Sequence, residues 1–198
     1  MVWNEDISDW YELIYKRTIK FYEIFRGLFI MNLKKIIINS LLLAIGLILH
    51  QVAPPLLFGM KPDILLTMMF ITILISKDYK LALIISIASG ILTAATTTFP
   101  GGQIPNVIDK LITGQIVYLM FKITDGKLNN QFQMGLVSVI GTVLSGTIFL
   151  GSAFYIFGLP APFSILMYTV VLPATIVNTL VGVILYNAIH LALKRTAY

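Results

Sequence analysis

Residues 132–157 read FQMGLVSVIGTVLSGTIFLGSAFYIF and contain no charged side chain. A helix needs about 20 mainly apolar residues to cross the hydrocarbon core of a bilayer, because each residue advances it by about 1.5 Å. The stretch is long enough for such a crossing, and it stops at Gly158-Leu159-Pro160, residues that do not readily continue a helix. It therefore predicts a transmembrane helix.

The composition of the whole chain also indicates a membrane protein. Of its 198 residues, 58% are hydrophobic and 12% are charged, against about a quarter charged in an average soluble domain. So few polar side chains cannot cover a water-facing surface, which excludes a soluble enzyme, a disordered chain and a nucleic-acid-binding domain. We therefore attribute the net charge of +5 to cationic cytoplasmic loops and expect no nucleic-acid partner.

Apolar stretches on either side of residues 132–157 predict the rest of the bundle. They cover residues 36–49, 62–76, 81–95, 105–123 and 163–193, the last with an expected kink at Pro173. We therefore expect an all-α integral membrane fold, a bundle of six transmembrane helices within residues 31–198.

Residues 1–30 differ from the rest of the chain, because both acidic and basic side chains occur there between apolar ones. The apolar residues recur at three- and four-residue steps: Trp3, Ile7, Trp10, Ile14, Phe21, Phe25 and Leu28. This pattern predicts an amphipathic helix on the cytoplasmic membrane surface. A helix docked on the bundle, or a true start at Met31, would also explain the segment.

The basic side chains favour one side of the membrane. That side holds Lys34, Lys35, Lys77, Lys80, Lys122, Lys127, Lys194 and Arg195, whereas the other side holds Lys61 and Lys110. Because short cytoplasmic loops carry an excess of lysine and arginine, both termini are predicted to lie in the cytoplasm.

The three connections on the outer side are rich in proline and glycine. They comprise residues 50–63, 96–106 and 158–162, and no proline lies in an inner connection. Such residues form fixed turns, so we expect these loops to fold back over the bundle and cap a substrate cavity. Ordinary short turns between helices would have a similar composition.

The charged residues on the outer side are Lys61, Asp63, Asp109 and Lys110. Asp109 and Lys110 share a predicted helical face with Asn106 and Thr113. Ionisable side chains at membrane depth are costly, so they normally face a cavity or a partner. An acid and a base together suit a zwitterionic ligand. A structural contact between Asp109 and Lys110, with the lysine reaching towards the interface, is the alternative.

Two further helices carry patterns that concern binding or packing. On the last predicted helix, Tyr168 and Asn178 lie on a polar face, where Asn178 would either meet a ligand or hydrogen-bond a neighbouring helix. On the first predicted helix, Ser40, Ala44 and Gly46 form a small-residue stripe that lets another helix approach closely. Packing within the protein would explain both patterns.

Motifs for catalysis are missing from the sequence. It contains no P-loop, no H-E-x-x-H pair, no G-x-S-x-G turn and no cysteine. We therefore expect neither an enzyme nor a cofactor or metal site, and no ATPase site in this chain.

Two runs on the outer side resemble a known family. Gly59-Met-Lys-Pro-Asp63 and Thr96-Thr-Thr-Phe-Pro-Gly-Gly-Gln-Ile-Pro-Asn-Val-Ile-Asp-Lys110 are similar to the tryptophan-transport membrane protein family. That family belongs to the substrate-binding (S) components of energy-coupling factor transporters, and the resemblance covers residues 31–193.

The resemblance implies a six-helix S component in a bacterial cell membrane, which binds an amino acid or a vitamin from outside beneath its outer loops. It implies docking on a transmembrane coupling protein that works with two cytoplasmic ATPases. The family's docking surface of small residues falls on Ser40 and Ala44, where Ser40 replaces the more typical alanine.

The resemblance and the polar residues together predict capture of L-tryptophan. The predicted site residues are Lys61, Asp63, Phe99, Gln103, Asn106, Asp109, Lys110, Tyr168 and Asn178. One of the lysines would bind the carboxylate of tryptophan, and one of the acids would bind its ammonium group. The aromatic rings would pack against the indole, whose N–H would donate a hydrogen bond to a side-chain amide oxygen. A stand-alone secondary carrier, an S component for another aromatic or vitamin ligand, and a structural protein are the alternatives.

Overall fold

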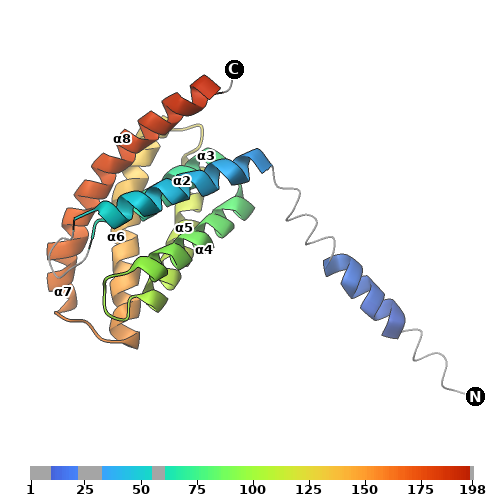
Figure 1. The fold of residues 1–198 in the computed structure, drawn as a ribbon, viewed down its shortest axis with the longest axis horizontal. Helices are drawn as coiled ribbons and strands as arrows, with labels where there is room; N and C mark the ends of the chain where they lie inside the picture. Colours follow the sequence, from blue (N-terminus) through green and yellow to red (C-terminus); the bar gives the residue numbers. More distant parts are fainter. Residues whose placement is uncertain (1–9, 22–32, 55–60, 197–198) are drawn as a thin grey trace, which may run out of the picture. The chain divides into compact units, whose positions relative to one another are not determined.

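The computed structural model describes residues 10–21, 33–54 and 61–196, most of which are helical. After a helix at residues 10–21, the elements are α2 (Leu33–Val52), α3 (Ile64–Ser76), α4 (Tyr79–Thr96), α5 (Gln103–Thr124), α6 (Asn130–Ile156), α7 (Phe163–Leu166), the π-helix η2 (Met167–Val171) and α8 (Leu172–Thr196) (Figure 1). No strand occurs in the described residues, which confirms the all-α prediction.

The chain divides into two units, Met1–Ile37 and Ile38–Tyr198. In the first unit, the helix at residues 10–21 exposes Trp10, Ile14 and Phe21, which belong to the predicted apolar stripe. The other members of that stripe, Trp3, Ile7, Phe25 and Leu28, lie outside the described residues. The position of this segment at the membrane surface stays a prediction.

Within the described residues, four helical stretches are long and apolar enough to cross a membrane. They are Leu33–Val52, Tyr79–Thr96, Asn130–Ile156 and Phe163–Arg195. The chain is therefore a helical membrane protein. The expected stretches at 62–76 and 105–123 also form helices, but α3 is shorter and α5 carries Asp109 and Lys110.

Helix α3 is the central helix of the second unit. It packs against α4, α5, α6 and α8, and nearly all of its side chains are buried. A helix that is apolar on every face is one that neighbours surround, so the side chains of α3 contact other helices rather than lipid. It begins at Asp63, whose Oδ1 accepts a hydrogen bond from the Leu66 amide at 2.9 Å. It ends at Lys77, which adopts a left-handed backbone with φ 49°.

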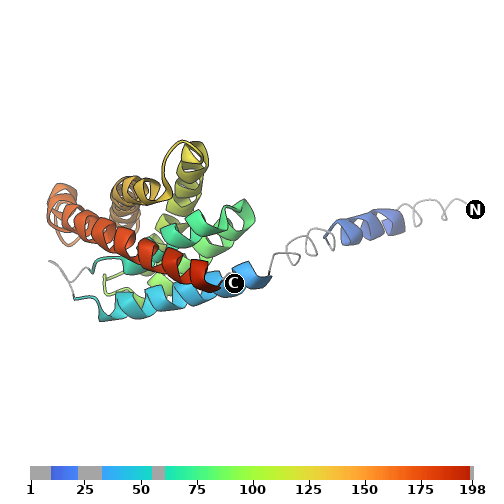
Figure 2. The ribbon, with the colours of Figure 1, turned by 90° about the horizontal axis from the view of Figure 1, so that it is seen from above.

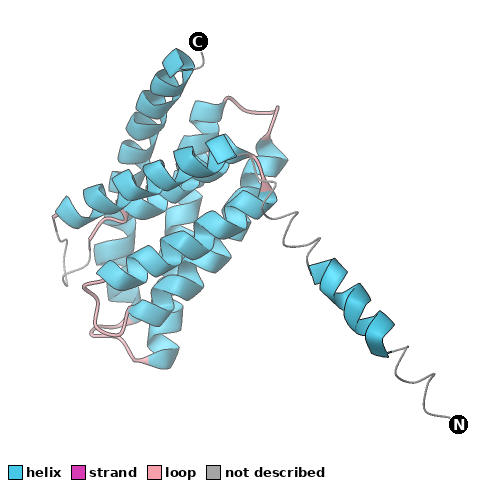
Figure 3. Ribbon diagram, turned by 45° about the vertical axis from the view of Figure 1, so that its right-hand side comes forward, coloured by secondary structure: helices cyan, strands magenta, loops and turns pink. Residues whose placement is uncertain are grey.

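The other long helices of this unit pack in chain order. Helix α4 lies along α5, α5 along α6, and α6 along α8 (Figures 1 and 2). The C-terminal ends of α2, α4 and α6 lie at one end of the bundle, and those of α3 and α5 lie at the opposite end (Figures 1 and 3). The alternation follows from short connections between antiparallel helices.

Helix α2 presents two different faces. Gly46 is buried, and a Cβ added there would approach the side chains of Met68 and Leu65 too closely, so this glycine allows the contact with α3. Ser40 and Ala44 are exposed. The small-residue pattern of the sequence therefore divides into an inward glycine and an outward pair.

The last transmembrane stretch contains a π-helical turn directly before Pro173. The Leu172 amide bonds to the Met167 carbonyl, five residues earlier, rather than to the fourth residue back. Proline has no amide hydrogen and cannot complete the regular pattern, and π turns are a common accommodation of such a break. The sequence anticipates an irregularity at this position, and the structure identifies its form.

Gly114 on α5 allows a close contact with Ser86 on α4. A Cβ added to it would overlap with Oγ of Ser86 and lie 2.8 Å from Cβ of Ser86. We expect Gly114→Ala to lower the free energy of unfolding by about 1–3 kcal/mol, because the helices would have to separate. Thermal unfolding of the purified protein in detergent measures this effect.

Gly151 on α6 is the matched control, because a Cβ added there would meet no atom within 4 Å. Gly151→Ala is expected to raise stability by about 0.5–1 kcal/mol, since alanine restricts the unfolded chain and favours helix. Equal effects of the two substitutions would show that the α4–α5 contact is not limited by Gly114.

Candidate functional site

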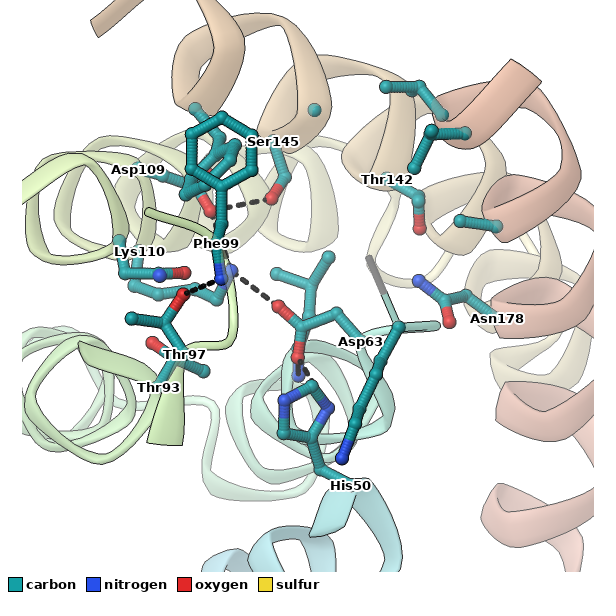
Figure 4. A pocket seen from close by; sticks show the side chains of 18 of the residues that line it. His50, Asp63, Thr93, Thr97, Phe99, Asp109, Lys110, Thr142, Ser145 and Asn178 are labelled. Atoms are coloured by element: carbon teal, nitrogen blue, oxygen red, sulfur yellow. Dashed lines mark hydrogen bonds and ion pairs between the residues drawn. The ribbon is translucent and has the colours of Figure 1, made fainter. Parts of the chain in front are cut away.

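A cavity lies at the end of the bundle where α2, α4 and α6 finish (Figure 4). Its polar lining consists of His50, Lys61, Asp63, Thr93, Thr97, Thr98, Asn106, Asp109, Lys110, Thr142, Ser145 and Asn178. Its apolar lining consists of Leu66, Phe99, Gly146, Phe149, Val170, Val171 and Ala174. All the long helices from α2 to α8 therefore contribute to one wall or another.

A buried cation between two acids forms the charged part of the cavity. Nζ of Lys110 lies 2.6 Å from Oδ2 of Asp63 and 2.6 Å from Oδ2 of Asp109. The side chains of Lys110 and Asp109 are 2% and 1% exposed, whereas that of Asp63 is 21% exposed. Charges buried this deeply persist only when they are paired and hydrogen-bonded, and here each has an opposite charge in direct contact.

Asp109 is held by two further hydroxyl groups. Thr113, one turn later on α5, donates to Oδ1 at 2.8 Å, and Ser145 on α6 donates to Oδ2 at 2.8 Å. The shared face of Asp109, Lys110 and Thr113 that the helical spacing predicts is buried in the structure. The structural contact between Asp109 and Lys110 exists, and both residues also line the cavity.

The start of α3 brings a second acid to the same cation. Asp63 caps this helix with one oxygen and contacts Lys110 with the other. His50 of α2 lies beside it, with Nδ1 3.1 Å from the Pro62 carbonyl oxygen and 3.8 Å from Oδ1 of Asp63. Lys61 lines the cavity and donates to the Gln51 carbonyl at 3.2 Å.

The opposite part of the wall carries polar groups without protein partners. Neither Nδ2 nor Oδ1 of Asn178 has a hydrogen-bond partner among the described residues, although the side chain is 1% exposed. The buried hydroxyl of Thr142 likewise has none, and Figure 4 shows it close to Asn178. Because an unpaired buried amide is costly, this region suits a ligand that both donates and accepts hydrogen bonds.

Aromatic side chains cover a third part of the wall. The rings of Phe99 and Phe149 meet edge to face, with centroids 5.3 Å apart and an interplanar angle of 78°. They belong to a buried cluster that includes Leu150, Val170 and Val171. Such a wall suits a flat apolar ring.

Most of the site residues predicted from the sequence line this cavity. The structure brings together Lys61, Asp63, Phe99, Asn106, Asp109, Lys110 and Asn178. Gln103 is exposed in the first turn of α5, and Tyr168 is 71% exposed on the π turn, so neither lines the cavity. Asn106 uses its amide to donate to the Gly102 carbonyl at 2.8 Å.

Sequence reasoning missed several of the lining residues. These are His50, Leu66, the threonines 93, 97 and 98, Thr142, Ser145, Gly146, Phe149 and the aliphatic residues of η2 and α8. Ser145 lies in a pattern typical of helix packing, and its spacing of three from Thr142 is the local signal that both share a face. His50 carries no such signal, because its role depends on where α2 ends. Among the described residues, no group of three or more His, Asp or Glu could hold a metal ion.

Comparison with known proteins agrees with the resemblance found in the outer connections. The model of the family "Tryptophan transporter TrpP" matches residues 32–194. A probable tryptophan transport protein of Clostridium acetobutylicum is 50% identical over 164 residues, which are 83% of this chain and 96% of the relative. Proteins of the same name from Clostridium perfringens and Bacillus subtilis are 45% and 42% identical, over 84% and 85% of this chain and 96% and 97% of theirs. No solved structure matches the chain.

These similarities extend over almost the whole bundle and include the segments that build the cavity. The family model begins just before α2 and ends within the last turns of α8, so it covers both acids, the lysine between them and Asn178. Each of the three relatives is at least 42% identical to this chain over most of both sequences, which is enough to establish common family membership. The chain belongs to the tryptophan transporter TrpP family.

Proposed function

We propose that this chain captures L-tryptophan from outside the cell and passes it to an ATP-driven module, as the membrane-embedded substrate-binding subunit of an energy-coupling factor importer. The family and the names of its relatives support tryptophan as the substrate. The observation that carries the proposal is the cavity itself, in which a buried Asp63–Lys110–Asp109 network adjoins aromatic and unpaired amide side chains.

The parts of tryptophan correspond to the parts of the cavity. Its carboxylate pairs with Lys110 or Lys61, and its ammonium group with Asp63 or Asp109. The indole ring packs against Phe99 and the aliphatic residues of η2, and Oδ1 of Asn178 accepts its N–H. Gln103 and Tyr168 would reach this ligand only after a rearrangement of their segments.

The surroundings of the site suit capture from outside. We propose six membrane crossings, with α3 and α5 crossing inside the bundle as buried helices and both termini in the cytoplasm. The outer connections, which carry Phe99 and Lys61 into the cavity, act as its cap. Ser40 and Ala44, exposed on α2, form the docking surface for a transmembrane coupling protein and its two ATPases.

Equilibrium dialysis of the purified protein against labelled L-tryptophan tests the proposed substrate. We expect saturable, submicromolar binding, and weaker binding of 1-methyltryptophan, which cannot donate a hydrogen bond from its ring. In Asn178→Leu the preference for tryptophan over its methylated analogue should fall from about 10-fold or more to near unity, because the acceptor is gone.

Phe154→Ala on the exposed side of α6 is the control and should bind as the unaltered protein does. Absence of any saturable tryptophan binding would contradict the proposed substrate. Tryptophan accumulation in cells that lack the ATPase module would identify a stand-alone secondary carrier instead.

A further inference from the structure

The two acids that contact Lys110 differ in how much hydrogen-bonding capacity they have left. An ionised carboxylate has about four acceptor positions. Asp109 already accepts three hydrogen bonds, from Lys110, Thr113 and Ser145. Asp63 accepts two, from Lys110 and from the Leu66 amide. Asp63 therefore has more acceptor capacity left for a ligand.

The two acids also differ in access to the cavity. The Asp63 side chain is 21% exposed and lies at the start of α3, whereas that of Asp109 is 1% exposed and is held between α5 and α6. An ammonium group has three donors, and Lys110 uses two of them on these acids, which leaves one. The accessible pair of opposite charges is thus Asp63 and Lys110.

We propose that the two acids have different tasks in binding the substrate. Asp63 binds the ammonium group of tryptophan, and Lys110 binds its carboxylate with the remaining N–H. Asp109, fixed by Thr113 and Ser145, is a positioning residue that holds the Lys110 ammonium group in place and does not contact the substrate. This assignment rests on the proposed function and deepens it.

The geometry of an amino acid agrees with this division. Its ammonium and carboxylate groups are attached to the same carbon, so they pair most easily with two opposite charges that already lie side by side. Oδ2 of Asp63 and Nζ of Lys110 are 2.6 Å apart. The bound zwitterion would complete a ring of alternating charges, in which each group has an opposite charge on both sides.

Indole-3-propionate, which is tryptophan without its ammonium group, distinguishes the two acids. Both ligands are used to displace labelled tryptophan from the purified full-length protein, from Asp63→Asn and from Asp109→Asn. The unaltered protein is expected to prefer tryptophan by about 100-fold, the worth of one charged hydrogen-bonded contact. Asp63→Asn should reduce that preference to about threefold or less. Asp109→Asn should lower the affinity for both ligands by about 10-fold and leave the ratio of the two affinities unchanged.

The variants are matched, since each replaces one carboxylate by its neutral isostere. Asparagine is a preferred N-cap residue, so Asp63→Asn keeps the start of α3, and Asp63→Ser is a second variant with the same property. Ser145→Ala, which removes one hydrogen bond to Asp109, should lower the affinities for tryptophan and indole-3-propionate equally. Ser152 lies on the same helix, and its hydroxyl donates to backbone carbonyls of α6. Ser152→Ala should therefore change neither affinity.

The outcomes separate this assignment from the proposed function. Loss of the preference in the Asp63 variants alone supports the assignment. Loss of the preference in Asp109→Asn alone, in both variants or in neither overturns it while tryptophan remains the substrate. Failure of the unaltered protein to bind tryptophan overturns the proposed function and the assignment with it.

Discussion

Lys110→Met is expected to abolish tryptophan binding and to lower the free energy of unfolding by about 3–5 kcal/mol. The substitution keeps a long side chain of similar volume but leaves Asp63 and Asp109 without the cation that both contact at 2.6 Å. Removing one partner from a buried charge pair leaves an uncompensated buried charge, which costs far more than the pair itself contributes. Thermal unfolding and tryptophan dialysis of the same preparation measure both effects.

A double variant tests whether the loss of stability comes from the acids that Lys110→Met leaves without a cation. Lys110→Met with Asp109→Asn removes the cation and the more deeply buried acid together, so it should be more stable than Lys110→Met alone. Lys61→Met is the control for stability, because Lys61 contacts a single backbone carbonyl at 3.2 Å. Its unfolding temperature should stay close to that of the unaltered protein. A Lys110→Met protein of unchanged stability would show that the network is not stabilised by its charges.

Ser40→Leu with Ala44→Leu is expected to abolish association with the proposed coupling protein and ATPases, while tryptophan binding stays unchanged. Both positions are exposed on α2, away from the Gly46 contact with α3, so larger side chains there disturb no internal packing. Small side chains let a second helix approach closely in the membrane, and two leucines would keep that helix away. Copurification after coexpression measures association, and dialysis measures binding.

Ala188→Leu on α8 is the matched control, because it adds the same bulk at another exposed alanine. It should copurify with the module as the unaltered protein does. Equal loss of association in both variants would place the docking surface elsewhere, and no association in any form would favour a stand-alone carrier.

The helices could be predicted from the sequence because hydropathy along a short stretch reports what surrounds it. All the apolar stretches after residue 31 form helices, and the four long apolar ones have the length of a membrane crossing. Asp109, Lys110 and Thr113 share a buried face, as helical spacing requires. These features depend on residues within a few turns of one another.

Tyr168 shows where this local reasoning stops. Its expected position on one polar face with Asn178 assumes a regular helix through both residues, but Tyr168 itself lies within the π turn at Met167–Val171. A π turn contains more residues than an α turn and therefore rotates everything before it relative to everything after it. Asn178 consequently faces the cavity, while Tyr168 is 71% exposed.

The sequence by itself determined the membrane environment, the helical class and the family, and it singled out Lys61, Asp63, Asp109 and Lys110, the four charged residues that line the cavity. Only the tertiary structure decided that Asp63 and Asp109 share one lysine, that Ser145 fixes the deeper acid, and that Thr142 and Asn178 present unpaired groups to the same cavity. The physical reason is distance along the chain. Asp63, Lys110, Ser145 and Asn178 belong to four different helices or their ends, and their meeting depends on how those helices pack rather than on any local pattern.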